Sequence, residues 1–467
     1  MRPNQSPIRS LILLTAALLG SAAGARADLS PAWVERWASA DGRKEGAADI
    51  ATDADGNVYV VATSEFNQLT SANLVTLSYA PDGTLRWLDT YDGGGQDLAV
   101  AVATDELGRV AVLGRASGDF LVLVYDGGTG TRLDEIVHDA GGIDDPRALA
   151  LGPGGAIAVT GSSWTDQEND YYTATFEANG ALRWSARYQG PGQFLFAHDV
   201  AYAVAFDASG DVFVTGSSNA PGTASGDFVT IKYRGADGVE LWLDRYSEGT
   251  NEVAYDLAVD GAGDPYVTGG SYQSGFVYVT RKYSGGDGSL LWMTKERPAA
   301  CSVATALALD GVGNLYVTGW ADPDCDESNF NDDIVTVRYG AGDGVKAWST
   351  SYGSPAVWHF EIPTDLAIDS SGKPWVTGVT VGVLVLLGYA PEGGAIVSTA
   401  TVAAGPDEQT GASALAFDSD DTLYLAGAAR DVNTEARDVL TLRFDSPWLF
   451  REDFESGTFG SWSIGPH

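Results

Sequence analysis

The chain has 467 residues, more than one ordinary hydrophobic core accommodates unless the fold is modular. Its 63 acidic residues outnumber the 27 lysines and arginines, which gives a net charge of −36 spread along the whole chain. Such an acidic surface repels phosphate backbones and anionic lipid headgroups, so nucleic-acid binding is not expected.

The first segment, residues 1–27, has the pattern of a signal peptide. Arg2 and Arg9 form a basic segment before the apolar run LILLTAALL, and Ala25-Arg26-Ala27 forms a small-x-small cleavage site. No apolar stretch reaches the roughly 18 residues that a membrane span needs. We therefore expect an exported protein without a membrane span, located outside the cell, on its surface or in the periplasm.

A repeated pattern fills residues 28–445. A strand-like segment followed by a D-x-x-G turn recurs about every 50 residues, and no amphipathic helical stripe of useful length interrupts it. The turn positions are Asp53, Asp105, Gly152, Asp207, Asp260, Asp310, Asp369 and Asp418. This period, made only of short strands, predicts an all-β fold, a β-propeller.

Each copy contains four predicted strands. The first alternates small and large residues, as in TALALD at 305–310, which suits the crowded centre of a ring. The second is rich in β-branched residues, and the third ends in an aromatic residue. The fourth carries a Trp with an aromatic residue four positions later, such as Trp184 and Tyr188, so both rings can pack between blades.

The last copy lacks its fourth strand, because the chain after Phe444 departs from the pattern. The missing strand has its match near the N-terminus, where Trp33–Trp37 reads W-x-x-x-W. We therefore predict that this N-terminal strand completes the last blade and removes a free sheet edge. The count is eight blades, with seven as the alternative because the copies at Gly152 and Tyr389 are degenerate. Residues 446–467 are predicted to be a C-terminal tail.

The repeated sequence pattern of DxxGNVYVTG, DFVTIKY and GxxLW resembles the bacterial β-propeller repeat family abbreviated SBBP, over residues 32–444. The resemblance implies a propeller fold and an exported or surface protein, and it implies no activity. The DFESGTFGSW stretch of the tail is similar to short C-terminal ends of exported bacterial proteins, or to the first strand of a truncated jelly roll.

The connections between strands predict two different faces. The D-x-x-G and Y-x-x-D-G turns are short and share one face, whereas the connections of variable length lie on the other, here called the long-loop face. Variable loops on a rigid scaffold commonly bind ligands. Cys301 and Cys325 fall in two such loops of one blade, which predicts a disulfide worth about 3 kcal/mol, with two buried free thiols as the alternative.

Several side chains on the long-loop face are candidate ligand-binding residues. They are His138, His198, His359, Trp164, Trp320 and Trp358. The histidines suit metal ligation or general-base work, but their spacing does not form a metal motif, so loop packing is the alternative. The tryptophans suit stacking on sugar rings or peptide side chains, or covering the loops' own small core.

An acidic loop is a candidate calcium site. Asp322, Asp324, Asp326 and Asp333 stand at positions one, three, five and twelve of a calcium-loop pattern. Glu327, however, occupies the place where that pattern requires Gly.

No arrangement of catalytic residues is recognisable in the sequence. We therefore expect a monomeric, non-catalytic binding module whose ligand is a protein or a glycan. The alternative is an enzyme with its site in the central funnel, either a calcium-dependent hydrolase or lyase, or a quinone-dependent dehydrogenase. Residues Ala236–Trp242 resemble the tryptophan-docking repeat of eight-bladed quinone dehydrogenases, which also carry neighbouring cysteines; here the two cysteines are far apart in sequence.

Overall fold

The computed structural model describes residues 27–445, except 40–42, 68–70, 166–167, 192–197, 220–224, 249–250, 273–274, 326–330, 354–358, 381 and 404–407. These residues form strands β1–β33 and one 3-10 turn, η1 (Pro153–Gly155), which replaces the D-x-x-G turn at Gly152. The predicted signal peptide and C-terminal tail lie outside the described residues. Within the described residues, no helix has the length and apolar character needed to cross a membrane.

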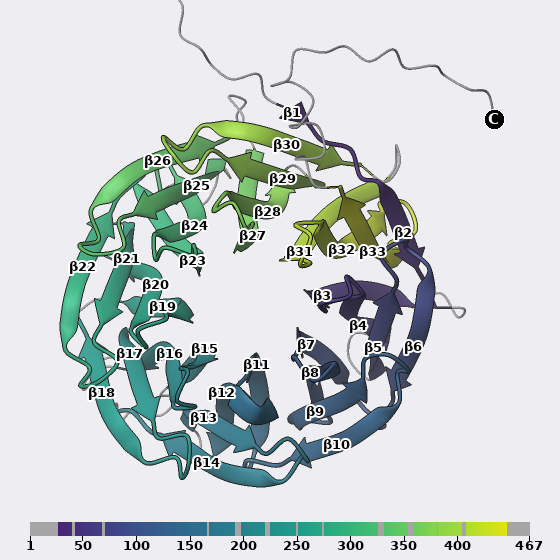
Figure 1. Cartoon of the computed structure of the whole chain (residues 1–467), viewed down its shortest axis with the longest axis horizontal. Coiled ribbons are helices and arrows are strands. Elements are labelled where there is room, and N and C mark those ends of the chain that lie inside the picture. The colour runs from purple at the N-terminus through teal and green to yellow at the C-terminus, as the bar shows by residue number, and fades with distance from the viewer. Residues whose placement is uncertain are drawn as a thin grey trace, which may run out of the picture.

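The strands form a ring of radial units of four strands, which follow one another in sequence order from the central axis to the rim except where β2 stands outside β33 (Figure 1). Four units are separate sheets. They are β7 (Asp97–Thr104), β8 (Arg109–Ala116), β9 (Asp119–Asp126) and β10 (Arg132–His138); β11 (Ile143–Leu151), β12 (Ile157–Thr165), β13 (Glu168–Phe176) and β14 (Leu182–Tyr188); β15 (Val200–Phe206), β16 (Val212–Asn219), β17 (Gly226–Tyr233) and β18 (Glu240–Tyr246); and β19 (Glu252–Val259), β20 (Pro265–Tyr272), β21 (Phe276–Tyr283) and β22 (Leu290–Glu296).

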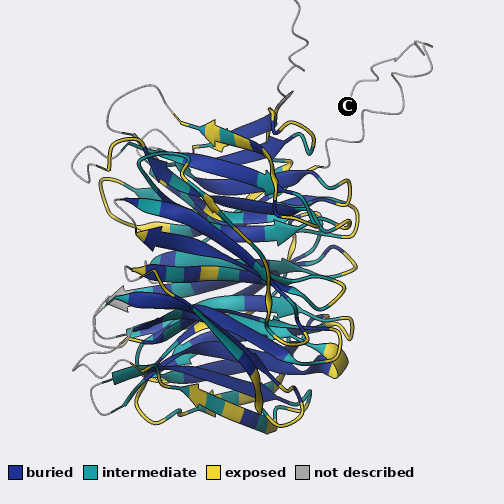
Figure 2. Ribbon diagram, turned by 90° about the vertical axis from the view of Figure 1, so that its left-hand side faces the viewer, coloured by how far each residue is buried: buried dark blue, intermediate teal, exposed yellow. Residues whose placement is uncertain are grey.

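The other strands belong to two larger sheets, in which short parallel pairings join neighbouring units. The nine-stranded sheet holds β23 (Cys301–Leu309), β24 (Leu315–Asp322), β25 (Asn331–Tyr339), β26 (Lys346–Tyr352), β27 (His359–Ile368), β28 (Pro374–Thr380), β29 (Val383–Tyr389), β30 (Ile396–Val402) and β1 (Ala27–Asp28). The eight-stranded sheet holds β31 (Glu408–Phe417), β32 (Leu423–Asp431), β33 (Arg437–Phe444), β2 (Trp33–Trp37), β3 (Lys44–Thr52), β4 (Val58–Asn67), β5 (Ser71–Tyr79) and β6 (Leu85–Tyr91). In the side view, buried residues fill the strands across the thickness of the ring (Figure 2).

The predicted pairing of the N-terminal strand is confirmed. Strand β2 lies antiparallel to β33, with Trp33 opposite Arg443 and Trp37 opposite Val439. The first strand of the repeat pattern and the last therefore belong to one unit, although about 400 residues separate them.

The D-x-x-G turn has a local cause. In the first copy, Asp53 Oδ1 accepts hydrogen bonds from the backbone N–H groups of Asp55 (3.0 Å) and Asn57 (2.8 Å). Gly56 adopts a φ of 74°, which a residue with a Cβ rarely tolerates. The aspartate thus supplies the hydrogen bonds of the turn and the glycine its backbone conformation, as expected for Asx-type turns.

Neighbouring units are joined by a docked tryptophan. The ring of Trp87 stacks on Tyr125 of the next unit, with centroids 5.5 Å apart, and its Nε1 donates to Gly127 O at 3.0 Å. Gly130, in the same turn, has a φ of 70° and lies so close to the indole that a Cβ would be 2.6 Å from it. The same indole-to-turn hydrogen bond recurs from Trp33 to Pro81, Trp184 to Gly235, Trp242 to Gly285 and Trp348 to Pro391.

Trp33 makes this joint between the last unit of the chain and the first. Its ring lies 6.1 Å from Tyr424 in β32 and 6.3 Å from Tyr79 in β5, and its Nε1 donates to Pro81 O at 3.0 Å. The N-terminal strand therefore completes one unit and docks it against the next.

We predict that Trp33→Ala lowers the free energy of unfolding by about 3 kcal/mol, because it removes an aromatic ring and a hydrogen bond from this joint. Urea unfolding followed by tryptophan fluorescence and circular dichroism measures the change. Val34→Ala is the matched control on the same strand, since Val34 is 46% exposed and its truncation should cost less than about 0.5 kcal/mol. Equal unfolding midpoints for Trp33→Ala and the wild type would contradict this role.

Three aspartates connect the innermost strands of neighbouring units. Asp49 Oδ2 accepts from Val102 N at 2.8 Å, Asp256 Oδ2 from Leu307 N at 2.8 Å, and Asp365 Oδ2 from Leu415 N at 2.9 Å. Burial raises the pKa of Asp49 and of Asp256 to about 7 and also raises the pKa of Asp365. The corresponding residues of the other innermost strands are alanines, at positions 101, 148, 203, 306 and 414.

These pKa values predict that the protein loses stability as pH rises from about 4 to 7. In that window the folded chain retains protons that the unfolded chain, with an ordinary aspartate pKa of 3.8, has released. Asp49→Ala introduces the residue that five other innermost strands have at this position. It should reduce the slope of the free energy of unfolding against pH by at most about 1.4 kcal/mol per pH unit. Urea midpoints at pH 5, 6, 7 and 8 measure it. Asp82→Asn is the control, because the pKa of exposed Asp82 is lowered and that residue titrates below the window. An unchanged slope in Asp49→Ala would overturn the assignment.

Candidate functional site

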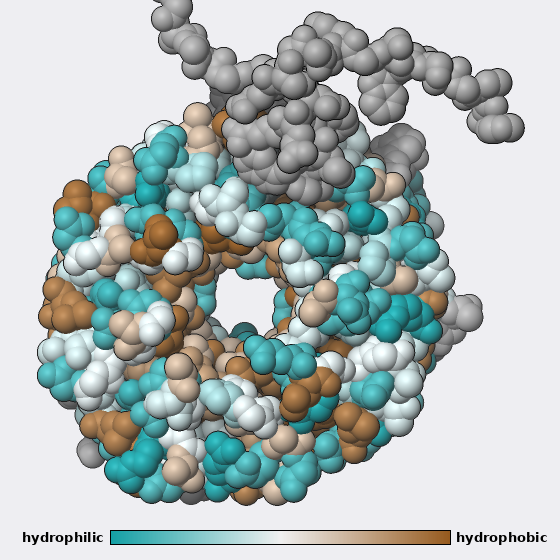
Figure 3. All heavy atoms as spheres, viewed as in Figure 1, coloured by the Kyte–Doolittle hydropathy of each residue, from teal (hydrophilic) through white to brown (hydrophobic). Residues whose placement is uncertain are grey.

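The centre of the ring is open (Figure 3). Each innermost strand contains a one-residue bulge, where its register with the second strand shifts. In β15, for example, the bulged Tyr202 is partly exposed between the buried Ala201 and Ala203. The bulge directs this side chain out of the interface between units and toward the central opening. The bulged residues are Ala48, Val100, Arg147, Tyr202, Tyr255, Thr305, Thr364 and Ser413.

Three successive bulges form what we call the aromatic ledge, Arg147, Tyr202 and Tyr255. The rings of Tyr202 and Tyr255 lie 5.4 Å apart, and the guanidinium of Arg147 lies 5.9 Å from the Tyr202 ring centre. Tyr255 is 36% exposed, and burial raises the pKa of both tyrosines, so both remain neutral phenols near pH 7. The ledge therefore presents two neutral aromatic rings, tilted by 50° to each other, with one cation at its end, in an otherwise acidic protein.

The alternating strand directions place the variable connections on one face, as predicted. Trp164 ends near His198 of the next unit, with ring centroids 5.8 Å apart, and both side chains reach the surface. Trp320 instead lies within β24, where it pairs with Val303 and Ile334 and is partly buried. Trp358 and the side chain of His359 lie outside the described residues. The structure thus brings together two of the candidate residues, Trp164 and His198, which the sequence analysis named separately.

The disulfide between Cys301 and Cys325 is present, and the two Cα atoms are 5.2 Å apart. Cys301 begins β23, and Cys325 follows β24. The bridge therefore joins the entry to the innermost strand with the variable connection of the same unit, and it anchors this part of the long-loop face.

The predicted calcium loop is described only in part. Asp322 is buried, and its Oδ1 accepts a hydrogen bond from Asp324 N at 3.0 Å, so it stabilises the start of the connection. Asp333 belongs to β25 and pairs with Ala321. Asp326 lies outside the described residues, and a calcium site there stays a prediction.

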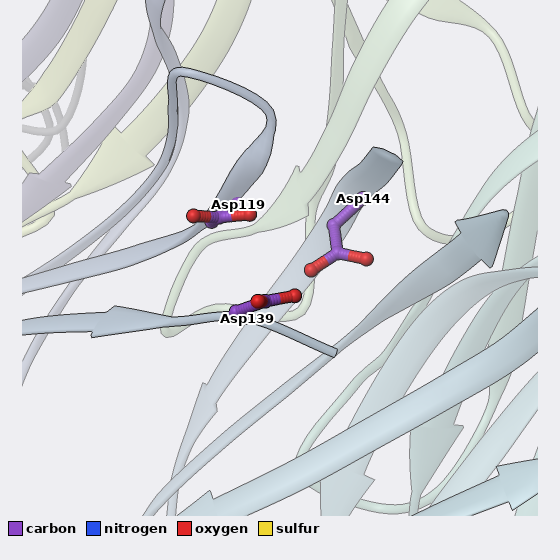
Figure 4. Close-up of side chains that lie close together, drawn as sticks. All are labelled: Asp119, Asp139 and Asp144. Carbon is purple, nitrogen blue, oxygen red and sulfur yellow. The ribbon is translucent and has the colours of Figure 1, made fainter. Parts of the chain in front are cut away.

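A different acidic cluster does assemble on this face. Asp119, Asp139 and Asp144 each offer a carboxylate oxygen within 4.8 Å of the other two, and the three side chains point toward one another (Figure 4). Asp144 is fully buried, Asp119 is partly buried and Asp139 is exposed. Burial and the neighbouring carboxylates raise the pKa of Asp119 and of Asp144.

His138 stands beside this cluster, but its side chain has a packing role. One ring nitrogen, Nε2, is 2.7 Å from the hydroxyl of Tyr172, and the imidazole contacts the rings of Tyr172 and Phe176. Burial lowers the pKa of His138 more than the three nearby aspartates raise it. Its side chain is therefore held against the next unit.

Sequence reasoning missed both the aromatic ledge and the acidic cluster. The ledge depends on the bulge, which turns one residue of each innermost strand out of the alternating pattern. The cluster draws on a hairpin, a loop and a strand, and the chain separates its first and last members by 25 residues. A signal in the repeat alignment existed on the fourth strand, because Val137 stands where the next two copies have Arg187 and Arg245.

No family model matches the chain, and no curated protein matches it. Solved structures with a similar fold include a quinohemoprotein alcohol dehydrogenase from Pseudomonas putida (TM-score 0.57, 13% identity, covering 94% of this chain and 78% of that one). They also include Sqt1 from Chaetomium thermophilum (0.55, 12%, 87% and 97%) and the Dos1 propeller (0.53, 9%, 89% and 95%). At these identities the likeness extends to the fold alone: the chain is a β-propeller.

Proposed function

We propose that this protein is an exported, monomeric, eight-bladed β-propeller that acts as a non-catalytic binding module. The blade count is supported by the repeat pattern and by the sets of four consecutive strands. Export is supported by the signal-peptide pattern of residues 1–27 and by a disulfide, which persists in oxidising compartments.

The observation that carries the binding function is the aromatic ledge. Tyr202 and Tyr255 expose ring surface at the wall of the central opening, and Arg147 offers hydrogen-bond donors beside them. Neutral aromatic faces pack against the C–H surface of sugar rings, and an adjacent guanidinium binds hydroxyl or carboxylate oxygens. The ligand class that fits this chemistry best is a glycan that enters the opening from the long-loop face.

The ledge is suited to binding rather than to bond cleavage. Its exposed groups are two phenols and a guanidinium, none of which is a general base near pH 7. The next three innermost strands around the ring, β23, β27 and β31, carry hydroxyl groups at Thr305, Thr364 and Ser413, and Ser413 donates to Ala47 O at 2.7 Å. These groups can orient a polar ligand through hydrogen bonds.

We expect Tyr255→Ala to weaken binding to an immobilised panel of neutral and uronic-acid oligosaccharides about five- to thirtyfold, because stacking of one ring contributes on the order of 1–2 kcal/mol. Surface plasmon resonance on the oligosaccharides that bind the wild type measures the change. Tyr272→Ala is the matched control, since Tyr272 is 47% exposed at the end of β20, away from the bulges.

Two results would contradict this function. If no oligosaccharide binds the wild type, the glycan assignment is wrong. If Tyr272→Ala weakens binding and Tyr255→Ala does not, the ligand sits on the outer loops instead of the ledge. A quinone absorption band in the protein purified from its native host would favour the enzyme alternative.

A further inference from the structure

The cation of the aromatic ledge has a counter-ion on its own strand. Arg147 Nη2 donates to Asp145 Oδ2, and the two side chains are 45% and 42% exposed. Burial raises the pKa of Tyr202, and the two charges act on that pKa in opposite directions, since Arg147 lowers it and Asp145 raises it. Asp145 therefore lies close enough to the ledge to offset the charge of Arg147 there.

Both charges depart from the repeat pattern, and they do so in the same unit. Asp145 stands two positions before the bulged residue of β11, and the other innermost strands carry glycine or an aliphatic residue at the equivalent positions 46, 98, 200, 253, 303, 362 and 411. Arg147 is likewise the only charged residue among the bulged residues of these strands. An ion pair, rather than a single cation, thus distinguishes this unit at the wall of the central opening.

The ion pair leaves hydrogen-bonding groups of both kinds available. Among the described residues, Arg147 makes no hydrogen bond besides the one to Asp145, and Asp145 Oδ1 accepts none. A sugar hydroxyl both donates and accepts hydrogen bonds. Neighbouring hydroxyls of one neutral sugar can therefore donate to Asp145 and accept from Arg147, while the sugar ring packs on Tyr202 or Tyr255.

The rest of the innermost strands adds negative charge to the opening. In the described part of these strands, Lys44 is the only other lysine or arginine, and it pairs with Glu435 at 3.7 Å. Burial raises the pKa of Asp49 and of Asp256 to about 7, and the charge of Asp365 adds to both shifts. At pH 8 Asp49 and Asp256 are therefore mostly ionised, and an anion that enters the opening meets negative surroundings.

We propose that Asp145 determines the specificity of the ledge: by pairing with Arg147 it makes the site select neutral glycans and reject uronic acids. This inference rests on the proposed glycan-binding function and narrows the class of ligand. A ligand carboxylate that displaced Asp145 from the guanidinium would leave Asp145 unpaired beside it, with two carboxylates for one cation. A neutral sugar leaves the pair intact. The selectivity therefore depends on a repulsive group as well as on attractive ones.

The test compares hexasaccharides of mannose, glucose and galactose with hexasaccharides of the corresponding uronic acids. Surface plasmon resonance at pH 8 and about 0.05 M NaCl measures both classes where charges are weakly screened. We expect the wild type to bind at least one neutral hexasaccharide, and to bind its uronic-acid counterpart about tenfold more weakly or worse, because the like charges repel each other.

Asp145→Asn should strengthen the binding of that uronic acid about tenfold, because Arg147 is then free to pair with the ligand. It should change the binding of the neutral sugar less than about threefold, since asparagine retains an acceptor oxygen. The gain should shrink at about 0.5 M NaCl, and it should disappear in the double variant Asp145→Asn with Arg147→Gln.

Asp237→Asn is the matched control. Asp237 pairs with Arg234 in the turn between β17 and β18, and these side chains are 49% and 48% exposed, so the variant removes the same charge from a similar pair. Its affinities for both classes of sugar should equal those of the wild type.

Two results would overturn the inference while the glycan function stands. One is binding of the uronic acid by the wild type as tightly as its neutral counterpart, which needs no variant to measure. The other is a preference that Asp145→Asn leaves unchanged. If neither the wild type nor Asp145→Asn binds any of these sugars, the glycan function itself is wrong and the inference fails with it.

Discussion

The architecture depends on one contact between units, the docking of an outer-strand tryptophan into the turn of the next unit. The indole supplies a large apolar surface and a single N–H donor, and the turn supplies an aromatic ring, a carbonyl and a glycine with positive φ. Radial sheets have little surface in contact near the rim, where they diverge, and large side chains fill that space. At Trp33 the same contact joins the two ends of the repeat pattern, so the ring depends on a strand that lies far from its partners in sequence.

Much of this fold could be predicted because each repeated residue has a local role. Asp53 makes the hydrogen bonds of its turn, Gly130 leaves room for an indole, and the alanines of the innermost strands fit the crowded centre. The W-x-x-x-W match of Trp33–Trp37 identified the strand that completes the last unit, because that unit visibly lacked one. The disulfide followed from topology, since two loops of one unit must lie at the same end.

The candidate sites were harder to predict for a physical reason. A bulge changes the side of the strand on which a side chain lies. The sequence around Tyr202 does not reveal the bulge that separates it from the buried residues on either side. The cluster of Asp119, Asp139 and Asp144 is defined by three-dimensional proximity and by the loss of an arginine, which becomes visible only when strand registers of several units are compared. Function in a repeated scaffold therefore resides where one copy departs from the others.

The aromatic ledge and the acidic cluster, where one unit differs from the others, both lie around the long-loop face and the adjoining central opening. The ledge at Arg147, Tyr202 and Tyr255 begins three residues after Asp144 along β11, so the hydrogen bond from Asp144 N to Gly118 O also helps to position the strand that carries Arg147. A rigid wall with few rotatable groups lowers the entropy lost on binding. The regular units elsewhere keep this wall in place.

Hydrogen exchange of the folded protein measures most directly whether the N-terminal strand joins the two ends of the ring. If β2 is bound as an integral outer strand, amides of β33 exchange as slowly as those of β17 in a central unit, and amides of residues 33–37 are also protected. Exchange of residues 33–37 within seconds, together with fast exchange along one edge of β33, would contradict the assignment.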